Sequence, residues 1–160
     1  MSLEAVRDYF SQKGIDHRIE VMEVSTATVD EAAKAHQVVP DQIAKTLSFK
    51  VQEDPILIVV SGASRIDNKK YKQRFGKKAK MLTPEEVLDV TGHAVGGVCP
   101  FGLVQNVPVY LDASLKKHAE VIPAAGASNS AIRLTIEELE THSNCSEWVD
   151  VCIATDSAPQ

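Results

Sequence analysis

Hydrophobic and polar residues alternate along Ile43–Val51 with the two-residue period of a β-strand. One predicted face carries Ile43, Lys45, Leu47, Phe49 and Val51, and the other carries Ala44, Thr46, Ser48 and Lys50. The apolar face is the predicted core face, so Lys45 lies among buried side chains, whereas Lys50 is solvated. Burying an unpaired ammonium is costly, which makes Lys45 a candidate functional residue. The alternative is that Lys45 lies at the strand end and reaches water along its methylene stem.

Other segments have the alternation or the continuous apolar run of a strand. They lie at residues 17–22, 55–60, 107–112, 120–123, 131–134 and 147–151. The run at 55–60 is apolar on both faces and is therefore predicted to be a central strand. It follows a turn at residues 53–55, so we expect it to pair with residues 43–51 as a hairpin.

Capping residues and apolar spacing mark the helices. Helices are predicted to begin at Leu3, Thr28, Asp67, Thr83, Ser114 and Thr135. Three of these starts have a threonine followed three residues later by glutamate, as in a capping box. The order of elements predicts a single α+β domain over residues 1–153, with a mixed, mainly antiparallel sheet flanked by helices. Residues 154–160 are predicted to be a flexible C-terminal tail.

The composition is that of a globular protein, because 44% of the 160 residues are hydrophobic. No apolar run approaches the ~20 residues needed to span a bilayer. The N-terminus lacks the regions of a signal peptide, so we expect a cytoplasmic protein that does not bind membranes. The three cysteines have no CxxC spacing and the five histidines are scattered. Neither a disulfide framework nor a metal or other cofactor is therefore expected.

Charge is distributed unevenly along the chain. Residues 65–80 hold eight basic residues and one acid, whereas the remaining chain holds nine basic residues and twenty-one acids. A segment of charge +7 thus sits on a body of charge −12, which is typical of a phosphate-binding patch. The alternative is an ordinary solvated basic helix.

The chain also contains two loops of small residues. Thr91–Gly102 holds four glycines and a proline, and Ala124–Gly126 is equally small. Such loops can expose backbone N–H groups that bind a carbonyl oxygen or a phosphate, although both can also be tight turns. No P-loop or GxSxG motif is present, which leaves Cys99 beside His93 as the candidate nucleophile pair. Cysteines are more often buried small hydrophobes.

Four motifs occur in a recognisable order between about Val24 and Leu139. They are Ile43-Ala44-Lys45-Thr46-Leu47, Val60-Ser61-Gly62 before a basic helix, Gly96-Gly97-Val98-Cys99-Pro100-Phe101-Gly102, and Ala125-Gly126. This ordered set resembles the YbaK/EbsC and prolyl-tRNA synthetase editing-domain family of aminoacyl-tRNA deacylases. The resemblance implies a free-standing hydrolase that removes the amino acid from mischarged tRNA, such as mischarged tRNA-Pro. An aminoacyl-tRNA synthetase is a further partner that the resemblance suggests.

The resemblance also implies roles for individual residues. Lys45 would be the essential residue that anchors the tRNA 3′ end, and the backbone of Gly102 would face the ester, with the amides of Gly102 and Gly126 stabilising the oxyanion. Substrate would further contact Thr46, Ser61, Gly97, Val98, Cys99, Pro100, Phe101, Ala124, Ala125 and Gly126. The acceptor stem would contact Arg65, Lys69, Lys70, Lys72, Arg74, Lys77 and Lys78. Water or a substrate group would be the nucleophile, without a covalent enzyme intermediate.

Two departures from the family pattern leave the amino acid open. Some members have serine where Ala124 stands, and others have a histidine that is missing between Val121 and Leu134. Small residues at Ala124, Ala125 and Ala127 favour a small or medium side chain. Two alternatives belong to other classes: a non-catalytic tRNA- or protein-binding module of the same fold, and a hydrolase that uses Cys99.

Overall fold

The structure is a computed structural model that describes residues 2–154. Its helices are α1 (Ser2–Ser11), α2 (Val29–His36), α3 (Asn68–Phe75), α4 (Pro84–Thr91) and α5 (Ile136–His142). Single 3-10 turns lie at η1 (Asp16–Arg18), η2 (Pro40–Gln42) and η3 (Ala113–Lys117). The predicted tail at 154–160 lies outside the described residues except for Ala154, which belongs to a strand.

A mixed six-stranded sheet forms the centre, in the order β8-β6-β2-β3-β5-β9. Its strands are β2 (Ile43–Val51), β3 (Asp54–Ser61), β5 (Val109–Asp112), β6 (Glu120–Pro123), β8 (Leu134–Thr135) and β9 (Glu147–Val149). Two smaller antiparallel pairs flank it, β1 (Ile19–Val21) with β7 (Ser130–Ile132), and β4 (Ser64–Ile66) with β10 (Cys152–Ala154). The α+β class is thus confirmed. Within the central sheet, however, three of the five pairings are parallel.

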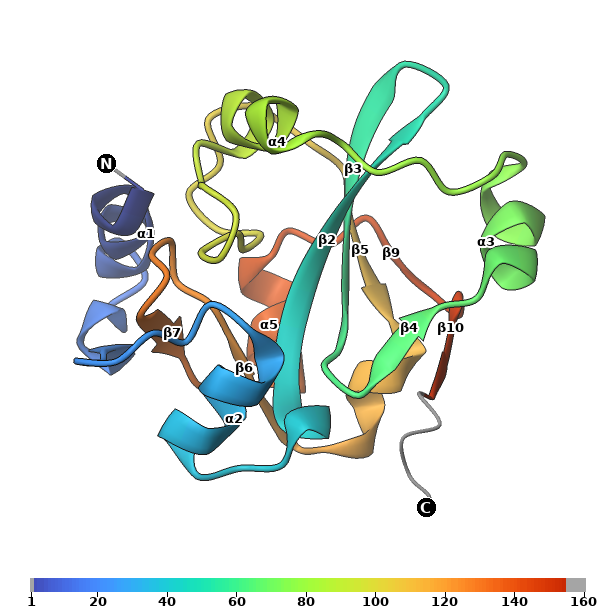
Figure 1. Ribbon diagram of the computed structural model, residues 1–160. Helices are drawn as coiled ribbons and strands as arrows, with labels where there is room; N and C mark the ends of the chain where they lie inside the picture. The colour runs from blue at the N-terminus through green and yellow to red at the C-terminus, as the bar shows by residue number, and fades with distance from the viewer. Residues whose placement is uncertain (1, 155–160) are drawn as a thin grey trace.

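The β2–β3 hairpin is the longest feature of the sheet, and it divides the molecule in Figure 1. Its register pairs Lys45 with Val60 and continues to Val51 opposite Asp54, as the hairpin prediction requires. Helices α1 and α2 lie on one side of the hairpin and α3 on the other. Lys50, near the tip, was predicted to be solvated. It instead pairs with Glu86 of α4 at 2.5 Å.

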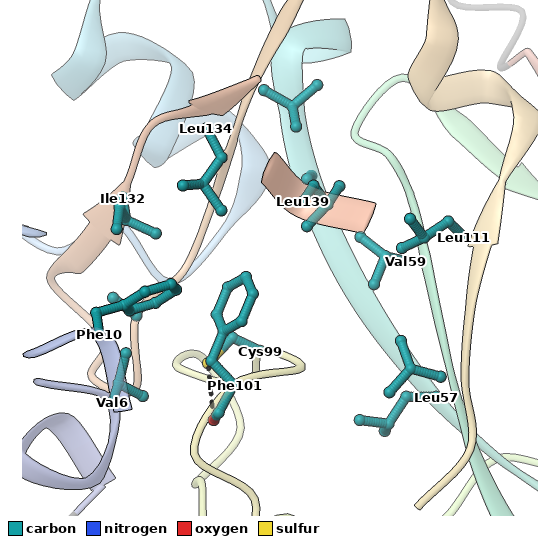
Figure 2. Close-up of a cluster of buried hydrophobic side chains, with 14 of the residues drawn as sticks. Val6, Phe10, Leu57, Val59, Cys99, Phe101, Leu111, Ile132, Leu134 and Leu139 are labelled. Carbon is teal, nitrogen blue, oxygen red and sulfur yellow. Dashed lines mark hydrogen bonds between the residues drawn. The ribbon is translucent and has the colours of Figure 1, made fainter. Parts of the chain in front are cut away.

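Both faces of the hairpin are covered, which corrects the prediction of a single core face. One core contains Leu57 and Val59 with residues from α1 and α5, and Figure 2 shows Val6, Phe10 and Leu139 packed in it. A second core lies against the opposite face and contains Phe49 and Ile58 with residues of α3 and β10. Alternation along β2 therefore sends Ala44 and Phe49 into two different cores.

Four helix starts agree with their predicted caps, whereas the predicted start at Ser114 lies inside η3, which Asp112 caps. Thr28, Thr83 and Thr135 each form a complete capping box, in which the threonine hydroxyl accepts from the third backbone N–H of the helix. Asp67 caps α3, and Gly76 ends it with a left-handed backbone. Ser64 begins β4, which pairs with β10, and neither strand was among those predicted.

Candidate functional site

A cavity of about 380 Å³ lies along the outer edge of β2. Its walls come from the α2 start, from β2, from the segment that leads into α4, from the glycine-rich loop and from the β6–β7 turn. The lining residues fall in the ranges 26–32, 43–48, 81–87, 95–98 and 122–131. Most of these side chains are aliphatic or hydroxylated, and Lys45 is the one charged residue among those that line the cavity.

Lys45 lies on the second-core face of β2, opposite Val60. Its ammonium donates to the main-chain oxygen of Gly62 at 3.5 Å. Within the described part of the chain Lys45 forms no ion pair. Burial lowers the pKa of Lys45, and the nearby Cys152 thiol opposes this only in part. The residue also lines a second hollow of about 530 Å³ with Asp41 and Gly62, so it separates the two spaces.

The two small-residue loops meet in the structure. The N–H of Gly126 donates to the oxygen of Gly97 at 3.1 Å. A side chain on Gly97 would come within 2.8 Å of Gly126 and Ala127 backbone atoms, so glycine is required by this close approach. The Gly97 N–H is also used, donating to Ala94 at 3.0 Å. In this structure neither amide is free to bind a substrate oxygen, which departs from the oxyanion role expected for Gly126.

The motif residues from Cys99 to Gly102 lie away from the cavity that holds Lys45. Cys99 and Phe101 are completely buried in the first core (Figure 2). Gly102 has a left-handed backbone and lies against Ala5 and Val6 of α1, where it lines a separate hollow with Pro100. Of the predicted pocket residues in this loop, Val98 does line the cavity, and so does the neighbouring Gly96. The structure therefore does not bring Gly102 beside Lys45.

Cys99 and His93 are close, yet they do not form an accessible catalytic pair. The Cys99 sulfur lies 3.6 Å from His93 Nε2, and both side chains are completely buried. Burial raises the pKa of the Cys99 thiol to about 12, so the thiol stays protonated at neutral pH. His93 Nε2 lies 2.7 Å from the Phe101 oxygen, and its Nδ1 contacts the Ser2 hydroxyl. His93 thus ties the loop to α1, and the burial of both side chains argues against the hydrolase that uses Cys99.

Of the remaining predicted substrate residues, some line the cavity and others are buried in the protein beside it. Thr46 and Ala124 line the cavity, whereas Ala125 is buried in the first core. The Thr46 hydroxyl is itself buried without a hydrogen-bond partner in the described chain. Ser61 is buried as well, and its hydroxyl donates to the side chain and the main-chain oxygen of Asp41. Ser61 therefore supports the end of the hairpin.

The basic segment forms β4, α3 and the loop that enters the cavity wall at Met81. Lys70 donates to Asp150 at 3.2 Å, and Arg74 pairs with Glu147 at 2.6 Å while it stacks over Phe75 and Tyr110. These two residues are engaged within the protein. The others are exposed and form no ion pair among the described residues, namely Arg65, Lys69, Lys72, Lys77, Lys78 and Lys80.

The sequence prediction missed the walls supplied by distant segments. Val29 and Ala32 of α2, Val87 of α4, and Met81 before it all line the cavity. Met81 and Val95 are 60% and 65% exposed, so apolar side chains surround the cavity. Their positions in sequence fit ordinary helix and loop residues, and no local pattern marks them as part of a site. In residues 2–154 no three His, Cys, Asp or Glu side chains gather as a metal site would need.

Comparison with known proteins gives the family. The model of the aminoacyl-tRNA editing domain matches residues 23–141, so the chain belongs to this family, which includes the editing domain of prolyl-tRNA synthetase. The chain is 51% identical over 153 residues to "Uncharacterized protein YwhH" of Bacillus subtilis, covering 95% of this chain and 98% of YwhH. It is 27% identical over 119 residues to "Putative Cys-tRNA(Pro)/Cys-tRNA(Cys) deacylase EbsC" of Enterococcus faecalis, covering 73% of each.

A solved structure agrees with the family assignment. The crystal structure of "a putative trans-editing enzyme for prolyl tRNA synthetase" superposes with a TM-score of 0.86 and 33% identity, covering 96% of this chain and 98% of that one. The shared fold includes the mixed sheet described above. No helix within the described residues combines the length and apolarity that crossing a membrane requires.

Proposed function

We propose that this protein hydrolyses the ester of mischarged aminoacyl-tRNA in trans, with the amino acid in the cavity and the tRNA 3′ end held by Lys45. Family membership makes an aminoacyl-tRNA the substrate class. The similarity to EbsC and to the trans-editing structure supports a deacylase that acts on a tRNA of the prolyl type. Cytoplasmic location and recruitment of a synthetase belong to the same proposal.

The observation that carries the proposal is the unpaired Lys45 ammonium in the wall of the cavity. A half-buried ammonium with a single carbonyl partner lowers the stability of the fold, so the residue is better explained by a ligand that supplies negative charge. The phosphate next to the terminal adenosine is such a group. The cavity itself is uncharged apart from Lys45 and suits a small or medium uncharged side chain.

The exposed basic side chains extend this electrostatic match to the acceptor stem. The loop that carries Lys77, Lys78 and Lys80 continues directly into the cavity wall at Met81 and Leu82. A tRNA whose 3′ end enters the cavity would place duplex phosphates near this loop and α3. Neutralising phosphates in this way releases counterions, so binding should weaken steeply with salt.

Chemistry is assigned to water or to a hydroxyl of the substrate. The buried Cys99 thiol stays protonated, and the Ser61 hydroxyl is committed to Asp41. Hydrolysis then needs positioning of the ester and stabilisation of the charge that develops on its carbonyl oxygen. Both needs can be met without a covalent enzyme intermediate.

The test is a deacylation time course with mischarged tRNA-Pro and with tRNAs that carry Ala, Ser, Thr, Cys and Val. Lys45→Ala is compared with Lys50→Ala, a lysine on the same strand whose ammonium pairs with Glu86. We expect hydrolysis of one or a few esters, loss of at least 100-fold in rate for Lys45→Ala, and little change for Lys50→Ala. Undiminished activity of Lys45→Ala would contradict the role of Lys45. Binding of tRNA without hydrolysis of any ester would indicate a non-catalytic binding module.

A further inference from the structure

The outer edge of β2 is paired at both ends and open in the middle. At its start, Ile43 and Ala44 pair with β6. Towards its end, the Ser48 oxygen accepts from the Leu82 N–H at 3.1 Å, and the Lys50 N–H donates to the Lys80 oxygen at 2.8 Å. The gap between these pairings is centred on Thr46.

The main-chain groups of Thr46 point out of this open edge. Groups along a strand alternate between its two edges, and the register of β2 with β3 is continuous. The Ile43 oxygen faces β3, since it accepts from Gly62 at 2.7 Å, whereas Ser48 and Lys50 bond outward. Thr46 therefore directs both its N–H and its C=O outward. Across residues 2–154 neither group has a hydrogen-bond partner on that edge.

The open edge is part of the cavity wall. The residues Lys45 to Ser48 line the cavity, and so do Ile122 and Ala124 on one flank of the gap and Met81 and Leu82 on the other. Unpaired main-chain donors and acceptors in apolar surroundings are rare, because their loss of hydration is not compensated. A cavity that holds one such donor and one such acceptor, beside a lysine, points to a ligand that supplies their partners.

An α-aminoacyl ester has both partners at the spacing of one residue in a neighbouring strand. Its carbonyl oxygen accepts a hydrogen bond and its α-ammonium donates one. We propose that Thr46 binds the aminoacyl group as a single added β-residue, with its N–H donating to the ester carbonyl oxygen and its C=O accepting from the α-ammonium. This inference rests on the proposed function, and it assigns to Thr46 the donor role that the structure does not give to Gly102 or Gly126.

The assignment also explains how charge is stabilised during the reaction. Water attacks the acyl carbon, the bond between that carbon and the ribose oxygen breaks, and the ribose oxygen takes one proton of the water. The other proton is released as the free amino acid ionises. Negative charge develops on the carbonyl oxygen in between, so the Thr46 N–H bond strengthens in the transition state. Because the main chain makes both contacts, they do not depend on the amino acid side chain.

The decisive comparison is between two proteins. The first is Thr46→Val. The second carries the α-hydroxy analogue of valine at position 46, so that an ester replaces the peptide bond between residues 45 and 46. The two proteins share every side chain; the ester removes the Thr46 N–H and also weakens the Lys45 carbonyl as an acceptor towards β3. Thr46→Val, whatever its own rate, serves as the reference for the ester protein. The ester protein should lose about 100-fold in kcat, as for other single oxyanion donors, with KM within threefold. A kcat within threefold of Thr46→Val would overturn the assignment.

A second measurement on the unmodified protein does not depend on folding of the ester variant. The ligand is a stable amide-linked aminoacyl-adenosine that carries the amino acid whose ester is hydrolysed fastest. Exchange of the Thr46 amide proton should slow at least tenfold when this analogue binds, and unchanged exchange would contradict the assignment. The matching analogue without the α-amino group should bind at least tenfold more weakly, and equal binding would remove the role of the Thr46 C=O.

Failure of this inference can be told apart from failure of the proposed function. If the wild type hydrolyses mischarged tRNA while the ester protein keeps its kcat, deacylation stands and Thr46 is not the donor. If the wild type hydrolyses no ester, the deacylase proposal fails. In that case the amide-linked aminoacyl-adenosine is made with alanine and tests whether Thr46 still binds an aminoacyl group. Unchanged exchange of the Thr46 amide proton at saturation would then overturn the binding role of Thr46 too.

Discussion

The Lys45 ammonium and the Gly62 oxygen meet at 3.5 Å across the end of the β2–β3 hairpin. Gly62 is fixed by its other neighbours. Its N–H donates to the Ile43 oxygen, and a side chain on Gly62 would come within 2.3 Å of the Pro40 oxygen. The carbonyl thus fixes the lysine without neutralising it. This leaves a positive charge between two hollows, where it is available to a negatively charged ligand.

The affinity for substrate should begin to fall at a lower pH than it would if Lys45 had the pKa of an ordinary lysine. Burial lowers the pKa of Lys45, and only the charged form below that pKa attracts phosphate. The affinity for a stable aminoacyl-adenosine 5′-phosphate analogue should therefore fall as pH rises through the lowered pKa. Isothermal titration between pH 6 and 10 measures this, and Lys45→Ala should bind more weakly than the wild type at low pH, with the difference between the two proteins shrinking as pH rises. Affinity of the wild type that stays constant to pH 10 would contradict the prediction.

Replacing Lys45 by methionine should stabilise the protein. A pKa that is lower in the folded state means that folding disfavours the ammonium, so the cost is present at neutral pH and disappears as pH rises above the unfolded pKa. Since the side chain is only half-buried, we expect a gain of about 0.5–2 kcal/mol at pH 7 for Lys45→Met. Urea unfolding at pH 7 and pH 10 measures it. The difference between the two proteins should shrink at pH 10, and a less stable variant would be inconsistent with this account.

Cys99 should be chemically silent in the native protein. Because burial raises its thiol pKa to about 12, iodoacetamide at pH 7.5 should leave Cys99 unmodified while it reacts with the more accessible Cys145. Cys99→Ala should keep its deacylation rate within threefold and lose about 1–3 kcal/mol of stability from the core. Mass spectrometry of the alkylated protein and urea unfolding provide the measurements. Loss of activity in a Cys99→Ala protein that is still folded would reinstate a role for the thiol.

Removing exposed positive charge near the cavity should weaken tRNA binding and its salt dependence. Lys77→Ala/Lys78→Ala removes two lysines that have no ion pair within the described chain, so the slope of log K against log salt should fall by about 2. The control Lys116→Ala/Lys117→Ala makes the same charge change on η3. Filter binding at several salt concentrations compares them. Equal slopes for both double variants would show that binding follows net charge only.

Acid stability should depend on the pair formed by Arg18 and Glu138. Arg18 donates two hydrogen bonds of 2.8 Å to the Glu138 carboxylate, which lower its pKa to about 2. The contribution is present above the unfolded pKa of about 4.5 and is lost as pH falls towards 2. For this partly exposed pair we expect Glu138→Gln to cost about 1 kcal/mol at pH 7 and almost nothing near pH 2. Thermal unfolding from pH 2 to 7 tests this, with the exposed Glu137→Gln as control.

Local patterns predicted the elements well because they act within a few residues. Thr28, Thr83 and Thr135 cap their own helices, and alternation along 43–51 gives a strand in any surroundings. Lys45 was also identified from its near neighbours, because it is a charged residue on an otherwise apolar strand face. The short strand β10 was missed because it exists only where Cys152 reaches Ile66 of β4.

What the sequence alone determined is the α+β class, the hairpin, the basic segment and the place of Lys45 on an apolar strand face, since each follows from neighbouring residues and their charges. What only the tertiary structure decided is which loops share a space. The fold turns Cys99 and Gly102 towards the first core and α1, and it brings α2 and Met81 to the cavity. Within residues 2–154 it also leaves the outer edge of β2 open at Thr46. These outcomes depend on packing between segments far apart in the chain, which no local pattern encodes.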